Sequence, residues 1–227
     1  MRFNLDNYNQ FLVENGVVGF YEDPIRLRSG GLTFWYANFR ALLKDSDVTD
    51  EAAECVYNFV ADRGLKPTNF FAVPEGPREF ASGANRILRI QTGVVVPATS
   101  LRAGYKTHGS PLDRYSVGPV VASMKPVLIE DVTTTGNSST EFVMLMQELG
   151  IPPLAVVSML NRQERRNDGR TVKELLEGSY NVAYLPMTAA ETVVPIAVGV
   201  LNPKGSILEG LRKEFTDRER YTAEIKV

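Results

Sequence analysis

The stretch from Pro126 to Ser139 constrains the fold of this chain more than any other part of the sequence. It begins with the apolar run 127–129, which is typical of a central parallel strand. A turn follows, and Ser138 or Ser139 is expected to cap a helix. The apolar residues of that helix recur at helical spacing, at Phe142, Leu145, Met146 and Leu149. The turn should therefore lie at the carboxyl end of a strand, where open α/β sheets bind ligands.

The turn combines an acidic pair with a set of hydroxyl groups. The backbone N–H groups, the hydroxyls and the helix dipole all suit a phosphate. The hydroxyls belong to Thr133, Thr134, Thr135 and Ser138. Glu130 and Asp131 would repel a bare phosphate, but carboxylates suit sugar hydroxyls or a metal ion. A ribose 5-phosphate, which has a diol beside a phosphate, satisfies both halves of the turn.

Composition and missing motifs exclude several other classes of protein. The stretch contains neither the P-loop pattern nor the glycine pattern of a Rossmann nucleotide site. A net charge of -2 and a pI near 5.6 argue against broad nucleic-acid binding. No secretory signal is visible, and no apolar run approaches the ~18 residues of a membrane span, so a cytoplasmic protein is expected. The single cysteine, Cys55, follows a helical apolar pattern and is expected to be a small core residue.

The remaining sequence predicts one α/β domain with a small additional lobe, as suits 227 residues. Helices are expected over 5–15, 50–63, 78–88 and 171–177. Further strands are expected within 17–40 and over 69–73, 94–97, 154–160 and 180–185. The tail, 207–220, is expected to be a solvated amphipathic helix whose charges have no functional role.

Two more segments have the composition of binding or catalytic loops. Residues 74–78 turn from a strand into a helix, and the free amides at Gly76 and the charge of Arg78 suit an anion. Residues 101–115 are rich in glycine, polar and basic residues without a consistent period, which predicts a mobile loop. This loop holds His108, the only histidine in the sequence.

The Pro126–Ser139 stretch resembles the phosphoribosyl-diphosphate (PRPP) motif of the type I phosphoribosyltransferases: an apolar strand, two acids and Val-x-Thr-Thr-Gly-x-Ser. Three other segments resemble parts of the orotate phosphoribosyltransferases. They are the aromatic segment 28–40, the loop 101–115 with Arg102, Lys106, His108 and Gly109, and the turn 161–166 with Arg162. Residues 74–78 resemble the pyrophosphate loop of the family. Ala103 stands where a second loop lysine is common, and Asn161 where aspartate is usual.

The resemblance implies the type I phosphoribosyltransferase fold, a central mostly parallel sheet flanked by helices with a small N-terminal hood. Residues 1–45 would form that lobe of the base-binding hood, and residues 46–227 the PRPP-binding core. The activity implied is transfer of ribose 5-phosphate from PRPP to orotate, giving orotidine 5′-monophosphate and pyrophosphate in pyrimidine synthesis. Two alternatives stay open: a transferase for a purine or another base, and a non-catalytic PRPP-sensing regulator.

The resemblance also implies roles for individual residues. Catalytic roles fall to Arg102, Lys106, His108 and Asp131. PRPP would be bound by Glu75, Gly76, Glu130, Asp131, Thr133, Thr134, Thr135, Gly136, Asn137 and Ser138. Orotate would be bound by Arg28, Tyr36, Thr134 and Arg162, with Trp35 as an alternative stacking partner for the base. Mg²⁺ would be held mainly by PRPP and water, without an assigned side-chain ligand, and the loop 101–115 would be shared across a homodimer.

Overall fold

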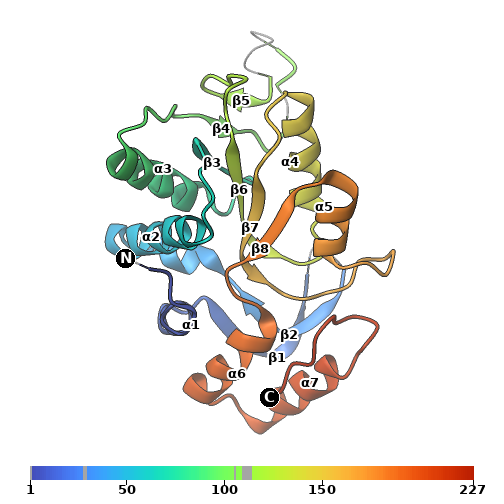
Figure 1. The fold of residues 1–227 in the computed structure, drawn as a ribbon. Helices are drawn as coiled ribbons and strands as arrows, with labels where there is room; N and C mark the ends of the chain where they lie inside the picture. The colour runs from blue at the N-terminus through green and yellow to red at the C-terminus, as the bar shows by residue number, and fades with distance from the viewer. Residues whose placement is uncertain (1, 28–29, 105, 109–113) are drawn as a thin grey trace.

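A computed structural model of the chain describes residues 1–227 except for residues 1, 28–29, 105 and 109–113. Its central sheet has four parallel strands in the order β3-β6-β7-β8 (Figure 1). The strands are β3 (Asn69–Ala72), β6 (Pro126–Thr133), β7 (Ala155–Asn161) and β8 (Ala183–Pro186). The predicted α/β class with a parallel sheet is confirmed, and β6 is the strand expected from the apolar run 127–129.

Helices cover both faces of this sheet. Val127 and Ile129 belong to one buried cluster, together with residues of α2 (Ser46–Asp62) and α3 (Arg78–Thr92). Leu128, between them, belongs to a second cluster with α4 (Asn137–Glu148) and α5 (Val172–Tyr180). Successive side chains of a strand point to opposite faces, so a continuous apolar run fits a sheet that is covered on both sides. Figure 1 shows the two helix pairs on opposite sides of the strands.

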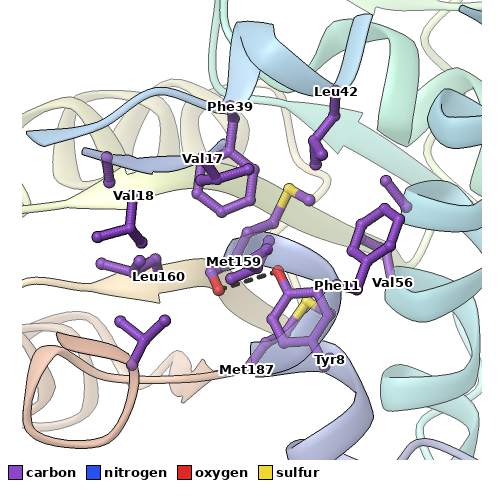
Figure 2. Packing of buried hydrophobic residues seen from close by; sticks show 14 of the residues in the cluster. Tyr8, Phe11, Val17, Val18, Phe39, Leu42, Val56, Met159, Leu160 and Met187 are labelled. Carbon is purple, nitrogen blue, oxygen red and sulfur yellow. Dashed lines mark hydrogen bonds between the residues drawn. The ribbon is translucent and has the colours of Figure 1, made fainter. Parts of the chain in front are cut away.

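The two ends of the chain meet below the carboxyl ends of the strands. The hairpin of β1 (Val18–Arg26) and β2 (Leu32–Ala37) packs against α7 (Gly205–Phe215), and α1 (Leu5–Glu14) packs against α6 (Ala190–Leu201). A short 3-10 helix, η1 (Phe39–Leu43), follows the hairpin. Figure 2 shows how α1 joins the core: the Tyr8 hydroxyl donates to the Met159 carbonyl at 3.1 Å.

Two expectations about local structure were wrong. Residues 94–97 form no strand, and Val95 is 86% exposed; Pro97 lacks the N–H that a strand pairing there would need. Two short strands, β4 (Ser100–Leu101) and β5 (Ser116–Val117), pair instead at the base of the loop 101–115. Helix α4 begins at Asn137 after Gly136 in the left-handed region, so neither predicted serine is its cap.

The C-terminal segment 207–220 also differs from the solvated helix that was expected. Helix α7 ends at Phe215, and Ile207, Leu211 and Phe215 are buried against the hairpin side of the core. Glu164 and Glu214 form ion pairs with Arg220 in the segment that follows the helix, and the Glu164 and Glu214 side chains are only 5% and 4% exposed. The expectation that the charges of this tail are all solvated is therefore wrong. Helix α6, which the sequence analysis did not assign, is apolar around most of its surface.

Two further features bear on function. Cys55 is partly buried against the core, and burial raises the pKa of its thiol to about 12, which keeps it protonated and unreactive. Within the part of the chain that the structure describes, no helix is both long and apolar enough to cross a membrane.

Candidate active site

A cavity of about 400 Å³ lies where β3, β6 and β7 end, bordered by the segment that leaves the β1–β2 hairpin. It brings together most of the residues that were predicted to bind PRPP and orotate. Those that line it are Tyr36, Glu75, Gly76, Glu130, Asp131, Thr134, Thr135, Gly136, Asn137, Ser138 and Arg162. Residues from four separate segments of the sequence therefore share one cavity.

Glu130 is the more deeply buried member of the acidic pair. Its residue is 7% exposed, and its carboxylate accepts hydrogen bonds from the hydroxyls of Thr133, at 3.0 Å, and Ser139. Burial raises the pKa of Glu130 to about 7; the two hydroxyls oppose this shift and the charge of Asp131 adds to it. This carboxyl group therefore changes its charge close to neutral pH.

Asp131 points to the opposite side of β6, toward the loop after β3. A Cβ atom on Gly76 would lie 2.1 Å from Asp131 Oδ2, so only glycine lets the two segments approach this closely. Burial raises the pKa of Asp131, while the Val132 N–H and the charge of Arg40 act in the other direction. In the same loop, Arg78 pairs with Glu75 at 3.2 Å, and the Pro74–Glu75 peptide bond is cis.

Residues 134–138, here called the phosphate loop, join β6 to α4. Gly136 has φ +69°, and a Cβ atom there would lie 2.7 Å from Val172 Cγ1, so glycine is needed for both its conformation and its packing. Helix α4 starts within the loop, which directs its first free N–H groups toward the cavity. Thr133, predicted to bind PRPP, is fully buried beside Glu130 and Ser158 and does not line the cavity.

Arg162 enters the cavity from residues 161–166, here called the base turn. Its side chain is 1% exposed and its guanidinium lies 3.9 Å from the ring centroid of Trp35. Its Nε pairs with Glu164 at 2.9 Å, Nη2 donates to Thr33 Oγ1 at 3.0 Å, and Nη1 lies 3.4 Å from the Trp35 carbonyl. Of the five N–H donors of a guanidinium, these contacts leave one on each terminal nitrogen. Two such donors suit a carboxylate.

The other residues that were predicted to contact the base differ in their positions. Trp35 is fully buried under Arg162 and is not exposed to the cavity, so the alternative of Trp35 stacking on a base is wrong. Tyr36 lines the cavity and remains available for stacking. Arg28 lies outside the described residues.

Several cavity residues were missed by the sequence analysis. Asn38 and Arg40 line the cavity, although their segment was noted only for its pattern, and Glu141 does so from α4. Arg166 lies behind the phosphate loop: its side chain is 17% exposed, pairs with Asp168 at 3.5 Å and donates to the Thr135 carbonyl and, at 3.0 Å, to Asn137 Oδ1. No sequence signal separates such an arginine from the solvated Arg165 beside it.

The three predicted catalytic residues of the loop 101–115 do not line this cavity. Arg102 and Lys106 donate backbone N–H groups to Tyr115 and Arg114, which extends the β4–β5 pairing. Figure 1 shows β4 and β5 at the end of the molecule opposite the β1–β2 hairpin. Arg102, Lys106 and His108 therefore do not contribute to the lining of the cavity of their own chain.

The cavity offers carboxylate oxygens that could bind a hard cation. Its lining includes Glu75, Glu130, Asp131 and Glu141. Among the described residues, no group of three or more histidine, cysteine, aspartate or glutamate side chains could hold a metal ion. A cation here would take most of its ligands from a bound phosphate compound and water.

Comparison with known proteins gives a consistent result. No protein-family model matches the chain. The sequence is 27% identical to an orotate phosphoribosyltransferase of Bradyrhizobium diazoefficiens over 151 residues, 66% of this chain and 79% of that protein. It is 24% identical to an orotate phosphoribosyltransferase of Alteromonas mediterranea over 218 residues, 95% of this chain and 96% of that protein. The crystal structure of orotate phosphoribosyltransferase from Francisella tularensis superposes with a TM-score of 0.68 at 17% identity, covering 92% of this chain and 98% of that one, which shows a shared fold.

Proposed function

We propose that this chain, a member of the type I phosphoribosyltransferase family most like its orotate-specific enzymes, transfers ribose 5-phosphate from PRPP to orotate. The bond between the anomeric carbon and the pyrophosphate oxygen breaks, and a bond to N1 of orotate forms as N1 loses its proton. The products are orotidine 5′-monophosphate and pyrophosphate. One observation carries the proposal: Arg162 shares a cavity with the acidic pair and the phosphate loop.

Each part of the substrates has a chemically matched partner in this cavity. The phosphate loop offers hydroxyls, backbone N–H groups and the start of α4 to the 5′-phosphate. Glu130 and Asp131 accept hydrogen bonds from the ribose diol. The two remaining donors of Arg162 bind the orotate carboxylate, and Tyr36 packs against the base.

Catalysis requires cations near the departing pyrophosphate, because negative charge develops there as the glycosidic bond breaks. Arg102, Lys106 and His108 supply that charge. Since they lie away from their own cavity, we propose that they act in the cavity of a second copy of the chain, in a homodimer. The loop also excludes water, which would otherwise hydrolyse the activated sugar.

Mg²⁺ fits the donor set of the cavity: Asp131 and Glu130 could supply carboxylate oxygens, and the diphosphate of PRPP would be its main ligand. When bound, the ion neutralises charge on the pyrophosphate group. We further propose that the enzyme works in the cytoplasm, where pyrimidine nucleotides are made.

The deciding assay follows orotate consumption with PRPP and Mg²⁺, using Arg162→Gln and Arg165→Gln as a matched pair. Turnover that Arg162→Gln abolishes and Arg165→Gln retains supports the proposal. A panel of bases then tests the acceptor, because Arg162 predicts a preference for an anionic base. A neutral purine as the best substrate would contradict the orotate assignment. PRPP binding with no turnover on any base would instead favour a sensing role.

A further inference from the structure

The base turn is tied to the C-terminal segment of the chain, residues 214–222. Their backbones run antiparallel, with a bridge between Glu164 and Tyr221. The Arg165 N–H donates to the Arg220 carbonyl at 2.7 Å, and the Thr222 N–H donates to the Gln163 carbonyl at 2.8 Å. The last part of the sequence is therefore attached to the turn that carries Arg162.

Side chains add to this attachment through a buried series of alternating positive and negative charges. Glu164 Oε1 lies 2.9 Å from Arg162 Nε and 3.3 Å from Arg220 Nη2. Arg220 Nη2 also lies 3.4 Å from Glu214 Oε1, and the Tyr221 hydroxyl donates to Glu214 as well. The side chains of Arg162, Glu164 and Glu214 are at most 5% exposed, and that of Arg220 is 20% exposed.

Arg220 and Glu214, at the outer end of this series of charges, form hydrogen bonds with the β1–β2 hairpin. Arg220 Nη1 donates to the Leu32 carbonyl, and the Phe34 N–H donates to Glu214 Oε2 at 2.9 Å. The neighbouring residue of the hairpin, Thr33, accepts from Arg162. The hairpin, the C-terminal segment and the base turn thus hold the Arg162 guanidinium from three directions.

From this arrangement we propose that Arg220 is a positioning residue for base recognition: through Glu164 it fixes the guanidinium of Arg162, which reads the carboxylate of the base. With Arg220 in place, Glu164 is held between two cations and can accept from Arg162 Nε in one orientation only. Without Arg220, Glu164 and Glu214 lose a shared partner inside the protein, where an unpaired charge is strongly unfavourable. The Glu164 carboxylate then changes its orientation at Arg162. As a result, the two N–H donors of Arg162 that face the cavity lose their alignment.

The inference rests on the proposed function, and it makes a prediction that a purely structural role does not. Orotidine 5′-monophosphate and uridine 5′-monophosphate differ only in the carboxylate on the base. Misalignment of Arg162 should weaken binding of the first nucleotide and leave the second unchanged. General loosening of the fold should weaken both alike.

The experiment measures the dissociation constants of both nucleotides and of PRPP by isothermal titration calorimetry. In Arg220→Gln we expect the affinity for orotidine 5′-monophosphate to fall about tenfold, while the affinities for uridine 5′-monophosphate and PRPP stay within about twofold. Arg218→Gln is the matched control, because Arg218 is on the same segment and its side chain lies 3.9 Å from Glu224 in an ion pair whose two side chains are both over half exposed. It should bind all three ligands as the wild-type protein does.

Arg220→Lys keeps the charge but donates from one nitrogen, so it should show a smaller loss in the same direction. This variant decides the question if Arg220→Gln does not fold. Equal losses for the two nucleotides, or an unchanged preference in both Arg220 variants, would overturn the inference. A wild-type protein that does not distinguish the two nucleotides would instead contradict the proposed function.

Discussion

A side chain at Gly76 would collide with Asp131, because a Cβ atom there would lie 2.1 Å from the Asp131 carboxylate. The loop after β3 and the end of β6 therefore meet at a point that only glycine permits. We expect Gly76→Ala to displace Asp131 and reduce kcat/KM for PRPP by about a hundredfold, the scale of a 1 Å misplacement in an active site. Steady-state kinetics at saturating orotate measure this loss.

Gly178→Ala is the control for that substitution, since nothing lies within 4 Å of a Cβ atom at Gly178 and its φ is not positive. We expect it to retain wild-type kinetics. Wild-type turnover in Gly76→Ala would mean that Asp131 does not contribute to the reaction.

Glu130 should make the stability of the protein depend on pH. Its pKa is raised from 4.5 to about 7, so the folded state binds a proton more tightly than the unfolded state does. The free energy of unfolding should then fall as pH rises from about 4.5 to about 7, by roughly 3 kcal/mol, and change little above that range. Glu130→Gln keeps the hydrogen-bond acceptor without the charge and should remove this contribution.

Urea unfolding of both proteins between pH 4 and pH 8 provides the measurement. The stability of Glu130→Gln relative to the wild-type protein should increase across this range and level off above pH 7. A constant difference between the two proteins at every pH would show that the pKa of Glu130 is the same in the folded and unfolded states.

The parts of the site that lie on continuous motifs could be predicted from the sequence. Residues 127–131 and 134–138 follow one another along a strand, a turn and a helix, so local patterns were enough to predict their place. Arg162, which directly follows β7, was assigned through the resemblance of the turn 161–166 to the family.

The parts that could not be predicted depend on contacts between distant segments. The Arg220–Glu164 pair spans 56 residues, and neither charge differs in local pattern from the solvated charges beside it. The burial of Trp35 under Arg162 likewise depends on how the hairpin lies against the sheet, which the sequence of the hairpin alone does not determine. The helix cap was mispredicted because Ser139 bonds Glu130 across the turn instead of its own helix.

Arg166 should support PRPP binding. It donates to the Thr135 carbonyl and to Asn137, so it fixes the phosphate loop from the base turn. We expect Arg166→Ala to raise the dissociation constant of PRPP about tenfold, the scale expected when a partly buried charged hydrogen-bond donor is lost. Arg165→Ala, which removes the neighbouring charge, should bind PRPP normally. Equal effects in the two variants would point to a general charge effect instead of a fixed loop.

The position of the loop 101–115 leads to a test of whether its cations act in a second subunit. Lys106→Ala should lower kcat strongly and leave PRPP affinity nearly intact, because the charge it meets develops mainly in the transition state. Asp131→Asn should also be inactive, because this substitution alters the cavity and not the loop. If each cavity uses the loop of its neighbour, a mixed dimer of these two variants contains one cavity with both defects and one with neither.

Mixing the two inactive proteins under conditions that exchange subunits should therefore restore activity, to about a quarter of the wild-type level when the subunits pair at random. If the loop served the cavity of its own chain, every subunit in the mixture would carry a defect in its own site and activity would not return. Native mass spectrometry of the mixture distinguishes the mixed dimer from the two homodimers by mass, so a failure to restore activity can be attributed to the loop and not to a lack of exchange.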